Sequence, residues 1–177
     1  MEPRAAPTAT LSPEAAQALA DVYARVDREI RSMGATCWLR GRCCDFETAE
    51  HVLFASSAEI AFVRAAHAER FAPHGVLCPF WKDGLCAERE RRPLGCRTYF
   101  CDPAYSDRVA SIHERYHREI CALADRFGIE YRYEPFVAAL RGGSNADAAG
   151  VELWRRDDVR PDARERGDVD DADQNDA

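Results

Sequence analysis

The spacing of its cysteines is the feature that most constrains this chain. Seven of the eight cysteines in 177 residues lie between positions 37 and 101. They form three groups, which are Cys37, Cys43 and Cys44, then Cys78 and Cys86, then Cys96 and Cys101. Short loops join the members of each group, and thiolates are soft ligands that favour zinc, iron–sulfur clusters and Cu(I). The spacing therefore predicts a metal site.

The N-terminal residues bear on whether these cysteines form disulfides. Met1 to Pro7 lack the basic segment and the apolar segment of a secretory signal, and no run approaches the roughly 18 apolar residues of a membrane span. We therefore expect a cytoplasmic protein with no membrane association. Thiols stay reduced in the cytoplasm, which favours metal binding or catalysis over disulfides.

The number of cysteines leaves the kind of metal centre open. A tetrahedral zinc ion takes four ligands, so seven cysteines imply two metals, a polynuclear cluster, or some thiols that are not ligands. Adjacent side chains such as Cys43 and Cys44 tend to point apart, which suits a cluster, or one ligand beside one packed thiol. We predict all seven as ligands. Cys121 follows an apolar helical position and is expected to pack in the core.

Arginines surround the cysteine groups. They are Arg40, Arg42, Arg89, Arg91, Arg92 and Arg97. Positive charge lowers the pKa of a neighbouring thiol and offsets the negative charge of a thiolate centre. A guanidinium also binds carboxylate or phosphate through two hydrogen bonds. Arg40 and Arg97 are the residues that we predict to contact a cofactor.

Apolar periodicity predicts an α+β fold. Helical spacing covers 12–33, 56–70 and 106–127, alternation predicts a strand over 129–133, and a short helix is expected over 135–140. Lys82-Asp83-Gly84 has the chemistry of a hairpin turn. We expect one small domain over 12–140, in which three main helices surround short strands and cysteine-rich loops. The segments 1–11 and 141–177 are expected to be disordered.

The charge distribution argues against nucleic-acid binding. Residues 151–177 carry ten acidic residues against five Arg, whereas the other 150 residues carry 21 acidic and 19 basic residues. The acidic balance therefore belongs to the tail, and the domain is nearly neutral.

His113 and His117 are spaced as i and i+4 on one predicted helix, where we expect them to lie on a solvated polar face. We expect a protein or small-molecule partner.

Taken together, these motifs resemble the YkgJ-like cysteine-cluster family, a zinc- or iron-chelating domain. The family pattern is Cys-x-x-Cys-x-x-Cys-Cys, then Cys-Pro-Phe, a further Cys, Arg-Pro, and Cys-Arg-x-x-x-Cys or a close variant. The matching residues are Cys37, Cys43, Cys44, Cys78-Pro79-Phe80, Cys86, Arg92-Pro93, Cys96-Arg97 and Cys101. Arg40 stands at the second cysteine of the pattern, so this chain either lacks one ligand or has an open position there.

The resemblance implies a cytoplasmic metal-binding protein. Iron, held as an iron–sulfur cluster, is the first hypothesis, and zinc is the second. One alternative is a structural zinc module for protein interaction. Another is a metal-dependent protein-modifying enzyme, because related family members include flagellin lysine methylases, which combine an iron–sulfur centre with S-adenosylmethionine. The sequence leaves open whether the chain is an enzyme.

Overall fold

The structure is a computed structural model that describes residues 11–35, 42–46, 51–67, 78–100 and 103–141. The two segments predicted to be disordered fall almost entirely outside these ranges. Cys37, Arg40 and Cys101 also lie outside them, so the predictions for these three residues stay predictions.

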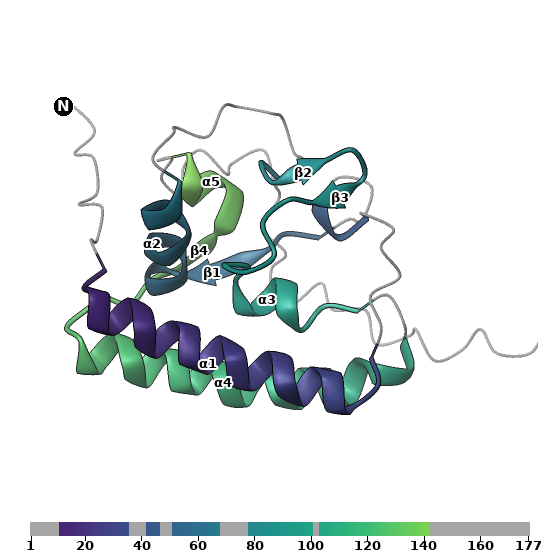
Figure 1. Ribbon diagram of the computed structural model, residues 1–177, viewed down its shortest axis with the longest axis horizontal. Coiled ribbons are helices and arrows are strands. Elements are labelled where there is room, and N and C mark those ends of the chain that lie inside the picture. The colour runs from purple at the N-terminus through teal and green to yellow at the C-terminus, as the bar shows by residue number, and fades with distance from the viewer. Residues whose placement is uncertain (1–10, 36–41, 47–50, 68–77, 101–102, 142–177) are drawn as a thin grey trace, which may run out of the picture.

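Two long helices form one layer of the domain (Figure 1). Helix α1 spans Pro13–Ser32 and helix α4 spans Ser106–Arg126, and the two lie side by side. The Ser12 hydroxyl accepts a hydrogen bond from the Ala15 amide at 3.1 Å, which caps the start of α1. The apolar stripes of both helices share one core, composed of Leu19, Val22, Tyr23, Val26, Ile30, Phe62, Leu94, Val109, Ile112, Tyr116, Ile120 and Leu123. These two predicted helices are confirmed.

A second layer combines two short strands with two helices. Strand β1 (Phe54–Ser56) leads directly into helix α2 (Ser57–Ala66), and strand β4 (Tyr133–Pro135) leads into helix α5 (Phe136–Leu140). The strands pair antiparallel, with the middle residue Ala55 opposite Glu134. A smaller core of Ala55, Ile60, Val63, Phe136 and Leu140 fills this layer.

The predicted strand over 129–133 is wrong in position, since β4 begins only at Tyr133. The residues before it make other hydrogen bonds. The Ile129 amide donates to the Ala124 carbonyl at 2.8 Å, and the Arg132 carbonyl accepts from the Ser57 amide at 2.9 Å. The alternation in the sequence therefore begins before the three residues that pair with β1.

The cysteine-rich part consists of a hairpin and short helices. Strands β2 (Trp81–Lys82) and β3 (Leu85–Cys86) pair antiparallel. Asp83 and Gly84 connect them with φ angles of 51° and 81°, as a tight hairpin turn requires. Helix α3 spans Leu94–Arg97, and 3-10 turns η1 and η2 span Arg42–Cys44 and Pro103–Tyr105. The α+β class is confirmed. Among the described residues, no helix is both long and apolar enough to span a bilayer.

A buried carboxylate joins the layers. Glu59 in α2 is only 2% exposed. Its Oε2 accepts hydrogen bonds from the Ser56 amide and hydroxyl, each at 2.8 Å, as part of a capping box at the start of this helix. Its Oε1 accepts from the Leu94 amide at 2.7 Å and from the Tyr23 hydroxyl at 3.1 Å. One side chain therefore connects α1, α2 and the start of α3.

Candidate metal centre

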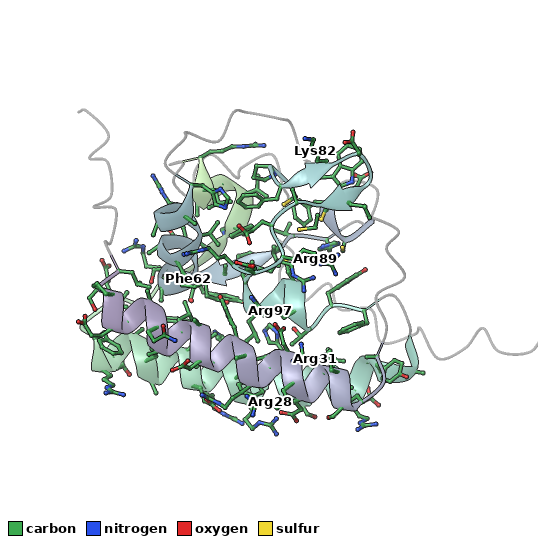
Figure 2. All side chains as sticks on the ribbon, viewed as in Figure 1. Arg28, Arg31, Phe62, Lys82, Arg89 and Arg97 are labelled. Carbon is green, nitrogen blue, oxygen red and sulfur yellow. The ribbon has the colours of Figure 1, made fainter. Side chains whose placement is uncertain are left out.

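Five cysteines, two of them adjacent in η1, line one small pocket of about 30 Å³. They are Cys43, Cys44, Cys78, Cys86 and Cys96. Figure 2 shows sulfur atoms gathered below the β2–β3 hairpin, near the labelled Arg89. Arg91 and Arg92 line the same pocket together with Glu88, so two cationic side chains and one acidic side chain lie beside the thiols. The structure therefore brings together five of the seven cysteines that the spacing singled out.

Backbone hydrogen bonds hold the first two groups together. The Cys78 amide donates to the Cys44 carbonyl at 2.9 Å, which ties the 3-10 turn η1 to the segment that enters the hairpin. The Trp81 amide then donates to the Cys78 carbonyl at 2.9 Å. The hairpin turn returns the chain at Cys86, whose thiol donates to the Glu88 carbonyl at 3.0 Å.

The loop that follows Cys86 is fixed by Glu88. Its Oε1 accepts hydrogen bonds from the Glu90 amide at 3.0 Å and the Arg91 amide at 2.8 Å. Its Oε2 lies 2.7 Å from Nε2 of His67 at the end of α2. The Arg91 guanidinium donates to the Phe62 carbonyl at 3.1 Å and lies over the Phe62 ring. These contacts attach the cysteine loops to α2.

Cys96 is carried by α3, which packs tightly against the segment entering β1. A Cβ placed on Gly95 would lie 2.7 Å from Cδ1 of Leu53 and 3.7 Å from the Phe54 carbonyl oxygen. The absence of a side chain at Gly95 therefore allows α3 to approach closely enough to place Cys96 in the pocket.

We expect Gly95→Ala to lower the free energy of unfolding by about 1 kcal/mol, because the added methyl overlaps the flexible end of Leu53. Leu53→Val removes the atom that would clash. In a double-mutant cycle followed by urea denaturation, the pair should show a favourable coupling of roughly 1 kcal/mol. Purely additive effects would mean that Gly95 and Leu53 do not limit the approach.

The thiols influence each other's ionisation. Hydrogen bonding with Cys44 lowers the pKa of Cys43 and of Cys86 to about 6 each, and nearby Arg92 acts in the same direction. The Cys44 pKa is raised by its interactions with Cys43, Cys78 and Cys86. Burial raises the pKa of Cys96. Cys44 therefore contacts three other thiols, and these contacts disfavour its own ionisation.

The arrangement has the donors that a thiophilic metal requires. Sγ of Cys43 and Sγ of Cys44 lie 4.0 Å apart, close to the roughly 3.8 Å that two 2.3 Å zinc–sulfur bonds give at a tetrahedral angle. Adjacent cysteines can therefore face one ion here. Within the described residues, however, no group of three or more His, Cys, Asp or Glu side chains already has the arrangement of a metal site. A bound metal would require the thiols to move closer to a common centre.

Arg97, one of the two predicted cofactor contacts, is engaged within the protein. Its side chain is 2% exposed, and Nη1 lies 2.5 Å from Oδ2 of Asp27 in α1. Nε donates to the Arg92 carbonyl at 2.8 Å, Nη2 donates to the Glu90 carbonyl, and the guanidinium lies over the Tyr23 ring. Figure 2 shows Arg97 between α1 and the cysteine loops. Contact with a cofactor would require some of these hydrogen bonds to break.

Cys121 and His113 lie outside the cysteine groups. Cys121 lies in α4, is not among the residues that line the thiol pocket, and contacts Tyr131 instead. His113 lies not on a fully solvated face but in the wall of a second cavity, with Nδ1 2.8 Å from the Thr98 hydroxyl. Sequence reasoning missed this role, although His113 follows Ile112 and lies one turn after Val109 of the apolar stripe.

Comparison of the chain with protein-family models, with curated proteins and with solved structures found no match. The resemblance to the YkgJ-like family therefore stays a prediction that depends on the cysteine motifs.

Proposed function

We propose that this protein binds a transition metal through its cysteine array, as a cytoplasmic metal-binding protein. The observation that carries the proposal is the convergence on one pocket of five cysteines from η1, the segment before β2, strand β3 and helix α3. Cys44 contacts Cys43, Cys78 and Cys86, and four thiolates are the number that one tetrahedral ion takes. Cys96 is the fifth, and Cys37 and Cys101 complete the predicted ligand set.

Iron held as an iron–sulfur cluster is the first candidate for the metal, and zinc is the second. Seven cysteines exceed the ligand number of one ion, which favours a centre with several metal atoms. Arg91 and Arg92 beside the pocket would offset the negative charge of such a thiolate centre. The contact between Cys43 and Cys44 is the feature that also accommodates a single zinc ion.

Replacement of one pocket thiol tests this proposal. We expect Cys44→Ser to lose most of the metal that the wild-type protein retains after anaerobic purification and desalting, because Cys44 contacts three other predicted ligands. The matched control is Cys121→Ser, which changes a thiol outside the pocket and should leave the metal-to-protein ratio unchanged. Metal content is measured by mass spectrometry of the digested protein, and far-UV circular dichroism verifies that both variants fold. Equal metal loss in both folded variants would contradict the proposal.

A further inference from the structure

A second and larger cavity adjoins the thiol pocket. It has a volume of about 540 Å³ and lies between β1 and α4, with Cys43 and Cys96 lining both spaces. Small-molecule sites typically have volumes of about 300–1,000 Å³. The cavity is therefore large enough for a ligand of one or two rings.

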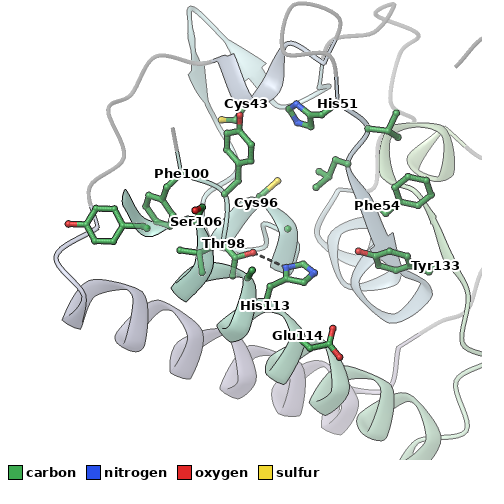
Figure 3. A pocket seen from close by; sticks show the side chains of 17 residues that line it. Cys43, His51, Phe54, Cys96, Thr98, Phe100, Ser106, His113, Glu114 and Tyr133 are labelled. Atoms are coloured by element: carbon green, nitrogen blue, oxygen red, sulfur yellow. Dashed lines mark hydrogen bonds between the residues drawn. The ribbon is translucent and has the colours of Figure 1, made fainter. Parts of the chain in front are cut away.

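Rings form much of the cavity wall (Figure 3). Besides His113, those among the described residues are His51, Phe54, Tyr99, Phe100, Tyr105 and Tyr133. Two of the pairs are already stacked, with centroids 5.3 Å apart for His51 and Tyr99 and 5.5 Å apart for Phe54 and Tyr133. Aromatic side chains attract other planar rings through offset stacking or edge-to-face contact. The wall therefore favours a planar ligand.

Hydrogen bonds assign the protonation of His113 in this wall. The Thr98 hydroxyl donates its one hydrogen to the Leu94 carbonyl at 2.9 Å, so it can only accept from Nδ1 of His113 at 2.8 Å. Nδ1 then carries the proton, and Nε2 of the neutral ring has a free lone pair. Figure 3 shows this second nitrogen on the side of the ring away from Thr98. Among the described residues, none donates a hydrogen bond to Nε2.

The neutral state of His113 agrees with its surroundings. Burial and the neighbouring His117 lower its pKa, whereas Glu59 and Glu114 raise it by a smaller amount. His51, another residue of the wall, has a nitrogen without a partner among the described residues. Nδ1 of His51 is buried and has no hydrogen-bond partner within the described part of the chain.

We propose that this cavity binds a small planar aromatic molecule that carries an N–H donor, held by ring stacking and recognised by Nε2 of His113. The donor on the ligand complements a wall nitrogen that can only accept. The inference does not depend on the metal, because neither the stacked rings nor the hydrogen bond from His113 to Thr98 involves a thiol.

Two probes that differ only at the donor test the proposal. Indole has an N–H group, and 1-methylindole has the same rings with the donor blocked. We expect the wild-type protein to bind indole about tenfold more tightly, which is the effect of roughly one hydrogen bond. Dissociation constants are measured by ligand-detected NMR on the full chain. The imidazole ¹⁵N signals of His113 should show Nδ1 protonated, and indole should shift the Nε2 signal.

Variants assign the preference to one nitrogen. His113→Asn retains an amide near the position of Nδ1 for the Thr98 hydroxyl but removes Nε2, so both probes should bind it equally. His117→Asn makes the same change one turn later, at a residue that pairs with Tyr131 and does not line the cavity, and should keep the preference. Failure of both probes to bind the wild type, equal binding of both, or a preference retained by His113→Asn would each overturn the proposal. If Cys44→Ser loses metal but still prefers indole to 1-methylindole, ligand binding in this cavity and metal binding by the cysteines are independent.

Discussion

Glu59→Gln is expected to lower the free energy of unfolding by roughly 2–4 kcal/mol. The wild-type carboxylate is buried and accepts four hydrogen bonds, from Ser56, Leu94 and Tyr23. An amide has only one oxygen, so its NH₂ group must face donors that then lack an acceptor. Unpaired buried donors are more costly than the simple loss of a hydrogen bond. Urea denaturation under reducing conditions, with equal metal content in both proteins, measures the change.

The matched control for this substitution is Glu119→Gln. Glu119 pairs with Arg25 on the surface of the two long helices, and both side chains are at least 40% exposed. Exposed ion pairs contribute about 0–1 kcal/mol, so the control should change stability little. If Glu59→Gln were as stable as this control, the carboxylate would not be the contact that joins α1, α2 and α3.

Arg97→Leu is expected to cost a similar amount, roughly 2–4 kcal/mol, because it removes the partner of Asp27 and the guanidinium donors to the Arg92 and Glu90 carbonyls. Arg97→Lys separates charge from geometry. A lysine can restore the ion pair with Asp27 but not the hydrogen bonds of the planar guanidinium. Its stability should therefore fall between those of the wild type and the leucine variant in thermal denaturation at fixed pH and salt.

The same two variants distinguish a structural from a ligand-binding role for Arg97. If Arg97 acts only within the protein, the lysine variant should bind metal at the wild-type ratio once it is folded. If the folded lysine variant is as stable as the wild type but loses metal, Arg97 contributes to the metal centre and its buried contacts matter less than the structure indicates.

Helical periodicity made the two long helices predictable from the sequence. Helix α1 has a Ser-Pro start and an apolar stripe that ends at Gly34, where φ is +74°. Helix α3 was not predicted. It has four residues, too few to show a period, and its first amide is held by Glu59 from another helix. Its existence depends on a contact between residues 35 positions apart.

The candidate metal centre was predictable in composition but not in geometry. Cysteine spacing identified the residues that line the pocket, because short loops keep soft ligands close together. Sequence spacing did not predict which arginines line the pocket. Arg97 and Arg92 both neighbour cysteines in the sequence, yet only Arg92 lines the pocket, since Asp27 on α1 holds the other. The position of His113 likewise depended on Thr98, which lies on a different element.

The most direct test of the central claim is the metal content of the wild-type protein purified without oxygen, measured together with its visible and EPR spectra. The proposal predicts a brown protein with iron and acid-labile sulfide, and spectra of a thiolate-bound cluster. A colourless protein with stoichiometric zinc on sulfur ligands would mean that the same cysteines bind zinc and not iron. A folded protein that retains no metal, or that binds it through nitrogen and oxygen alone, would contradict the proposed centre.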